Sequence, residues 1–190
     1  MEFTLFISLI GLIRNLSKDI LESKSNSNKA NFTNYIQPMW ASFKIVHEDY
    51  KESFYRYIEM VKSNKSLSEI RSEIRQDSIY SADLRGELRN LIEITSNDKS
   101  NNKMFTPFLL SINNYISLTD SLVLKKHELL SDSNIGRNML IAELSLSGLY
   151  SIDRKAALHC IERTLIDFQN RYNIVDKEYY RLKISIETII

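Results

Sequence analysis

Residues that break helices are scarce in this sequence. Its 190 residues include four glycines and two prolines, which leaves few positions for the tight turns that many short strands require. Long, uninterrupted helices are therefore favoured over a sandwich or a barrel. Because 43% of the residues are hydrophobic, the chain can bury a sizeable core. The sequence predicts an all-α fold, an elongated antiparallel bundle of about six helices.

The charge balance and the cysteine content limit the classes of partner and location. The chain has 25 Lys and Arg against 24 Asp and Glu, so no large field of one sign is available to bind nucleic acid. We expect no sequence-specific nucleic-acid binding. The single cysteine, Cys160, excludes an internal disulfide framework and fits a reducing compartment, so we expect a cytoplasmic protein.

The chain is expected to form one helical domain, 1–190, in three parts. Residues 1–22 predict an apolar helix, residues 23–33 a polar linker, and residues 34–190 the bundle itself. The linker is defined by Ser, Asn and Lys residues with almost nothing apolar among them. We found no repeat of fixed period and no glycine-rich phosphate loop.

The first helix admits two environments. Apolar residues from Phe3 to Ile13 surround most of its circumference and leave one polar stripe. These eleven residues reach about 16 Å at 1.5 Å per residue, roughly half of the ~30 Å hydrocarbon core of a bilayer. Burial against protein is therefore favoured. Membrane contact through residues 3–13 is the alternative, and in that case the chain would be a membrane-associating effector.

Two helices carry long heptad patterns, in which apolar residues recur at alternating steps of three and four. The second helix is expected over 34–63, with Pro38 in its first turn. The last helix is expected to begin near Asp153 and to continue to Ile190. At 1.5 Å per residue it reaches about 55 Å, longer than a globule of this size needs. We therefore expect part of its apolar seam to meet another chain.

A polar layer is expected where the second and third helices face each other. Ser66 and Glu69 predict a capping box at the start of the third helix, and the short link before it favours an antiparallel hairpin. In that register His47 comes within one turn of Asp77 and Ser81. Because an unpaired buried polar group costs roughly 1–3 kcal/mol, we expect His47 to hydrogen-bond one of them or a neighbouring tyrosine such as Tyr50 or Tyr80.

Association is the function that these patterns favour. We expect a non-enzymatic accessory or adaptor subunit that joins a homo- or hetero-oligomer, with a protein partner or a second copy of itself. The candidate interface residues are Trp40, Phe43, Phe54, Tyr57, Leu165, Phe168, Tyr172, Val175, Tyr179, Leu182 and Ile186. The bias toward 24 Ile and 16 Asn over six Ala is typical of AT-rich genes, and a bacterial accessory system such as phage defence is one setting.

A different function follows from a short resemblance at the start of the last helix. All-helical HEPN ribonucleases use an Arg and a His a few residues apart on a late helix, and the segment from Arg154 to His159 resembles that motif. The resemblance implies that Arg154 binds the scissile phosphate and that His159 acts in acid–base chemistry within a dimer. The chain departs from the family in having Lys155 after the arginine. A structural role for His159 is favoured.

No metal or cofactor is expected. A carboxylate-bridged dimetal bundle requires a Glu three residues before a His. The residues at that position before the three histidines are Lys44, Leu124 and Ala156.

Overall fold

The computed structural model describes residues 3–22, 27–80, 86–88, 90, 91, 93, 94, 104–117 and 153–188. Every regular element within these ranges is a helix, which confirms the all-α fold. The sequence also predicts a fourth helix from Thr106 to about Ser131 and a fifth over about 135–149. The fifth, and the fourth beyond Ser117, lie outside the described residues.

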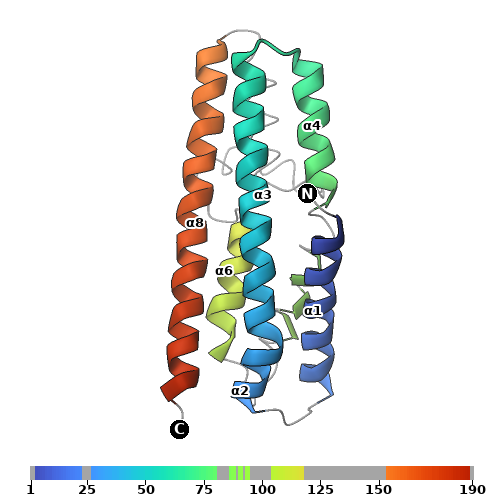
Figure 1. Cartoon of the computed structure of the whole chain (residues 1–190), viewed down its shortest axis with the longest axis vertical. Helices are drawn as coiled ribbons and strands as arrows, with labels where there is room; N and C mark the ends of the chain where they lie inside the picture. Colours follow the sequence, from blue (N-terminus) through green and yellow to red (C-terminus); the bar gives the residue numbers. More distant parts are fainter. Residues whose placement is uncertain are drawn as a thin grey trace.

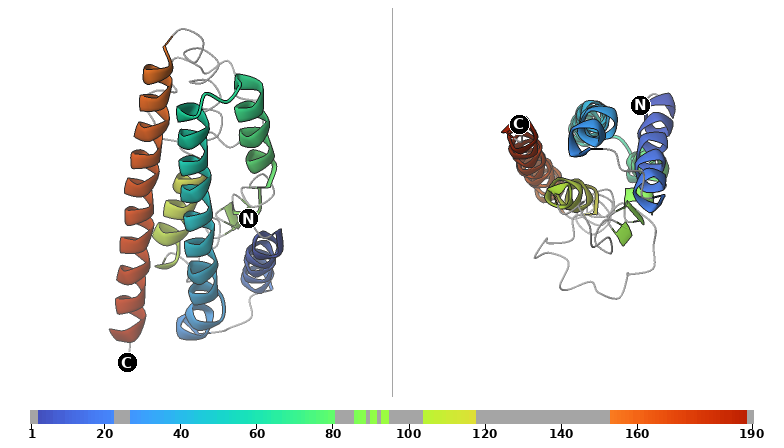
Figure 2. Two further views of the ribbon diagram at one scale, coloured as in Figure 1. Left: turned by 45° about the horizontal axis from the view of Figure 1, so that its top comes forward. Right: turned by 90° about the horizontal axis from the view of Figure 1, so that it is seen from below.

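A central helix, α3 (Gln37–Lys62), organises an elongated bundle (Figure 1). The longest described helix, α8 (Arg154–Thr188), runs antiparallel along one side of it. On the other side α1 (Phe3–Leu21) and α4 (Leu67–Tyr80) lie one above the other, each covering part of α3. A shorter helix, α6 (Thr106–Ser117), packs against α8, as the view from below in Figure 2 shows.

The helix that contains α3 begins earlier than the sequence predicts. It starts with α2 (Asn28–Asn31) and continues without a break through a π-helical turn, η1 (Phe32–Ile36), into α3. Ser27 caps it, since the Ala30 backbone N–H donates to Ser27 Oγ at 3.2 Å. The polar linker expected over 23–33 is therefore helical from Asn28 onward; residues 23–26 lie outside the described residues.

The π-helical turn has a physical cause in Pro38. Proline has no N–H to donate to the carbonyl four residues earlier, and its ring clashes with that carbonyl in a regular helix. In η1 the backbone widens, and the Gln37 N–H donates to the Phe32 carbonyl five residues back. The widened turn accommodates the proline inside a continuous helix, whereas the sequence placed Pro38 at a helix start.

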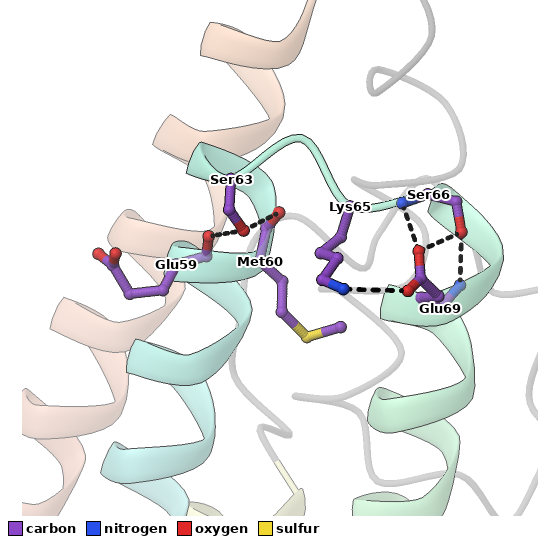
Figure 3. A network of polar contacts seen from close by, with 6 residues as sticks. All are labelled: Glu59, Met60, Ser63, Lys65, Ser66 and Glu69. Atoms are coloured by element: carbon purple, nitrogen blue, oxygen red, sulfur yellow. Dashed lines mark hydrogen bonds and ion pairs between the residues drawn. The ribbon is translucent and has the colours of Figure 1, made fainter.

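The turn between α3 and α4 is fixed by caps on both sides (Figure 3). Asn64 adopts a left-handed φ of 57°, and the Lys65 N–H donates to the Met60 carbonyl at 3.0 Å, which is a Schellman ending. The expected capping box is confirmed: the Ser66 N–H donates to Glu69 Oε2 at 2.9 Å, and the Glu69 N–H donates to Ser66 Oγ at 3.2 Å.

The hairpin itself is also confirmed, and an ion pair marks its register. Arg56 on α3 lies 2.8 Å from the Glu73 carboxylate on α4. The two residue numbers are nearly symmetric about Lys65, as expected for antiparallel helices joined by a turn centred there. Ile70 and Ile74 of α4 are buried against the core.

Helix α1 packs on protein over its central residues. Leu9, Ile13 and Leu16 are buried, and α1 contacts α3 and η1. The favoured environment for this helix is thus confirmed for those three side chains, while Ile7 is exposed. Among the helices that the structure describes, none is both long and apolar enough to cross a bilayer.

Candidate functional site

His47 is buried at the centre of the bundle and links three helices. Its Nδ1 lies 2.8 Å from the Tyr115 hydroxyl oxygen on α6, and its Nε2 lies 3.2 Å from Gln169 Oε1 on α8. The Gln169 amide nitrogen donates to Asn173 Oδ1 at 3.3 Å. Since an amide oxygen only accepts, Nε2 of His47 carries the proton and Nδ1 accepts from the Tyr115 hydroxyl. Both nitrogens are satisfied in the neutral imidazole.

Aromatic rings enclose the His47 imidazole. The Tyr172 ring stacks on it with centroids 3.9 Å apart and planes 14° apart, and the Phe168 centroid lies 5.8 Å away. Desolvation by these surroundings lowers the pKa of His47, although its hydrogen bond to Gln169 acts in the opposite direction. Burial also raises the pKa of the Tyr115 hydroxyl. The site therefore favours a neutral histidine.

His47 does not hydrogen-bond Asp77, one of the two residues expected from the hairpin. Asp77 accepts instead from the Tyr57 hydroxyl and, at 3.0 Å, from Arg56 Nη2, and Ser81 lies outside the described residues. Tyr57 is about ten residues, or ~15 Å, beyond His47 along α3. The contact between His47 and Asp77 was predicted wrongly because His47 faces α6 and α8, whose positions the hairpin does not determine.

The predicted interface residues form the core of this chain. Because most of them are buried, the expectation that the seam of α8 is too long for its own chain to cover was wrong. Trp40 of α3 stacks on Tyr179 at 5.0 Å and on Tyr172 at 5.7 Å between centroids. Buried members are Trp40, Phe43, Phe54, Tyr57, Phe168, Val175, Tyr179, Leu182 and Ile186, and partly buried ones are Leu165 and Tyr172. Their neighbours include α3, α6 and η1, whose Phe32 stacks on Tyr179, so most of these side chains offer little surface to a partner.

The structure does not bring Arg154 and His159 together. Arg154 Nη1 donates to Asn64 Oδ1 in the turn between α3 and α4, whereas His159 is exposed. Positions i and i+5 lie about 140° apart around a helix axis. Arg154 therefore faces the end of the hairpin while His159 faces solvent. Within the part of the chain that is described, no group of His, Cys, Asp and Glu is placed to hold a metal ion.

A hollow of about 300 Å³ opens between α6 and α8. It is lined by Pro107, Leu110, Ser111, Asn114, Tyr115, Arg171, Ile174 and Glu178. Two of these apolar side chains are well exposed, Leu110 at 40% and Ile174 at 55%. Tyr115 lies at the base and is fully buried, with its hydroxyl bonded to His47. The hollow thus combines apolar walls with a base held by the central hydrogen bonds.

Ion pairs within α8 flank the hollow. Arg171 Nε lies 3.0 Å from Asp167 Oδ2, and Arg171 Nη1 donates to the Asn114 carbonyl of α6 at 3.3 Å. On the other side of Ile174, Arg181 Nη1 lies 2.5 Å from Glu178 Oε1. The apolar opening therefore has a charged pair at each end, the arrangement of an apolar centre with a polar rim.

Sequence reasoning missed this hollow because it followed the heptad seam. Ile174 lies outside that seam, beside the buried Val175, and its apolar character was the available signal. Leu110 was equally inconspicuous, since α6 is apolar over much of its length. Only the packing of α6 against α8 shows that these two residues share one opening.

Comparisons with known proteins identify no relative. No protein-family model, curated protein or solved structure matches the chain.

Proposed function

We propose that this chain is a helical association module that binds protein through the hollow between α6 and α8. The observation that supports the proposal is the exposure of Leu110 and Ile174 on the two walls of one hollow. Single exposed apolar residues are ordinary on protein surfaces, but apolar residues that line an opening together, with a polar rim, are typical of protein-binding sites.

The rigidity of the hollow's base also supports the proposal. Tyr115 contacts Phe43 edge to face, with ring centroids 4.7 Å apart, and its hydroxyl is fixed by His47. A base held in this way loses little conformational entropy when a partner binds. The proposed function is still the association that the sequence favours, but it takes place through a face of α8 other than the buried seam. It involves no chemical reaction.

Site-specific photo-crosslinking in cells tests the proposal. A benzophenone side chain is incorporated at Leu110 or Ile174 of the full chain, and at Ile184 as the matched control. Ile184 is exposed to a similar degree, 60%, on the same helix but about 80° around its axis from Ile174. Illumination should give discrete protein adducts from the two hollow positions and much weaker ones from the control.

The mass of the adducts identifies the class of partner. An adduct of twice the chain mass indicates a second copy, and any other discrete mass indicates a different protein. Equal labelling from Ile184, or the lack of adducts from both Leu110 and Ile174, would contradict the assignment of association to this hollow.

A further inference from the structure

Charged residues on α8 are arranged in opposite order on the two sides of Ile174. Toward the start of the helix the first charge on this face is Arg171 and the second is Asp167. Toward its end, on the same side of Ile174 around the axis as Arg171, the first is Glu178, and Arg181 follows. Moving outward from Ile174, the order is therefore cation then anion on one side and anion then cation on the other. Lys177, three residues from Ile174, lies about 60° to the other side around the axis.

These residues share one face of α8. At 100° per residue, all four charged positions lie within about 60° of Ile174 around the helix axis. Asp167 and Arg181 are each two helical turns, about 10.5 Å, from Ile174, and their side chains are 48% and 61% exposed. The pattern is thus a surface feature of α8, and Arg171 and Glu178 line the hollow itself.

We propose that two copies of this chain pair through α8, antiparallel, about a two-fold axis beside Ile174. The inference rests on the proposed function and names its partner. A two-fold axis perpendicular to α8 brings Asp167 opposite Arg181 of the second copy and Arg171 opposite its Glu178. Symmetry repeats both pairs, so that four ion pairs surround one apolar centre.

The centre of this contact is apolar in both copies. Ile174 of each copy meets its equivalent beside the axis, and Leu110 of α6 extends the apolar surface along the hollow. The hollow of about 300 Å³ gives an aliphatic side chain of the second copy a place to enter. Such an interface is isologous, because the same patch serves both partners.

One further cation near the axis does not oppose the arrangement. Lys177 is as far from Ile174 along the chain as Arg171 is, on the other side. It lies about 120° around α8 from Arg171, so the two cations do not face each other across the axis. Opposite Arg171 the face carries Glu178 instead.

The same charges also pair within one helix, and this offers a simpler role for them. Arg171 pairs with Asp167, and Arg181 pairs with Glu178, as in many solvated helices. A charge exchange separates the two roles. Asp167→Arg combined with Arg181→Asp removes both pairs within the chain, because like charges then adjoin Arg171 and Glu178, but it keeps every pair between two copies.

Sedimentation velocity over a range of micromolar concentrations tests the inference. The full chain should approach twice its mass of 22.2 kDa. Asp167→Arg and Arg181→Asp should each weaken self-association at least tenfold, since each places like charges opposite one another. An equimolar mixture of the two single variants should recover the dimer, as should the double variant. Circular dichroism and Trp40 fluorescence verify that each variant is folded.

Three results would overturn the two-fold arrangement. They are a wild-type mass of 22.2 kDa at every concentration, single variants that associate like wild type, and a mixture that stays monomeric. A second pair of variants gives an independent test: Ile174→Glu places two carboxylates beside the axis and should abolish the dimer, whereas Ile184→Glu should leave it intact.

The two proposals fail in different ways. If the chain is monomeric in solution but crosslinks from Ile174 to a different protein, the two-fold pairing is wrong and the association module stands. If Leu110 and Ile174 give no adduct at all and the chain is monomeric, both are wrong.

Discussion

The two sides of α3 differ in the polar contacts that they add to the apolar core. Toward α6 and α8, stacked rings surround His47, and its hydrogen bonds join neutral groups. Toward α4, the Arg56 guanidinium bridges the carboxylates of Glu73 and Asp77, and its own side chain is 46% exposed. Buried aromatic area contributes far more free energy than ion pairs in contact with water. We therefore expect α3, α6 and α8 to form the most stable part of the bundle.

The largest expected effect tests the aromatic side, the side of α3 that faces α6 and α8. Phe168 is buried against Tyr115, with ring centroids 4.3 Å apart, and against His47 at 5.8 Å. Phe168→Ala should lower the free energy of unfolding by about 3–5 kcal/mol, because it removes apolar contacts and leaves a cavity. Urea denaturation followed by circular dichroism measures the change. Ile166→Ala, at a position 62% exposed, is the control and should change stability little.

A loss below about 1 kcal/mol for Phe168→Ala would contradict the expectation that the contacts with α6 and α8 stabilise the bundle more than those with α4. It would mean that the aromatic side contributes no more than an exposed ion pair.

An intermediate effect concerns acid. Burial lowers the pKa of His47 from its ordinary value of 6.5, so the unfolded chain binds a proton more readily than the folded one. The contribution to stability is complete above the unfolded pKa and declines as the pH falls from about 6.5 toward the folded pKa. The decline is at most about 1.4 kcal/mol per pH unit. Nearby Glu48 opposes the lowered pKa and Lys51 adds to it.

Urea titrations between neutral and mildly acidic pH measure this dependence. His47→Gln should remove most of the slope between pH 6.5 and the folded pKa, whereas His159→Gln, at an exposed position, should retain it. An unchanged slope in His47→Gln would show that other groups cause the acid sensitivity.

The smallest expected effect tests the ion pairs on the side of α3 that faces α4. Arg56→Gln removes both ion pairs to α4, and partly exposed pairs contribute only about 0–1 kcal/mol. The loss should shrink further in 0.5 M salt, because ions screen exposed charges. Urea denaturation at two ionic strengths measures it, with Arg163→Gln on α8 as the control. A loss of unfolding free energy as large as that of Phe168→Ala would show that these ion pairs stabilise the bundle as much as the aromatic contacts do.

Local features were predictable because their causes are local. Ser66 and Glu69 are close enough in sequence for their capping box to form without the rest of the chain. The start of α8 after Asp153 has the same basis, since the Asp153 carboxylate accepts the backbone N–H groups of Lys155 and Ala156. The heptad pattern likewise identified the apolar face of α8, because a helical period is a property of the sequence alone.

The partners of each face were not predictable in the same way. His47 bonds Tyr115 and Gln169, which are 68 and 122 residues away in sequence. The hollow that carries the proposed function likewise joins Leu110 to Ile174 across two helices. The period of the sequence determined which face of a helix is apolar, but only the arrangement of α3, α6 and α8 decided which apolar side chains are buried. Burial depends on which helices meet, and that choice is made by packing across the whole chain.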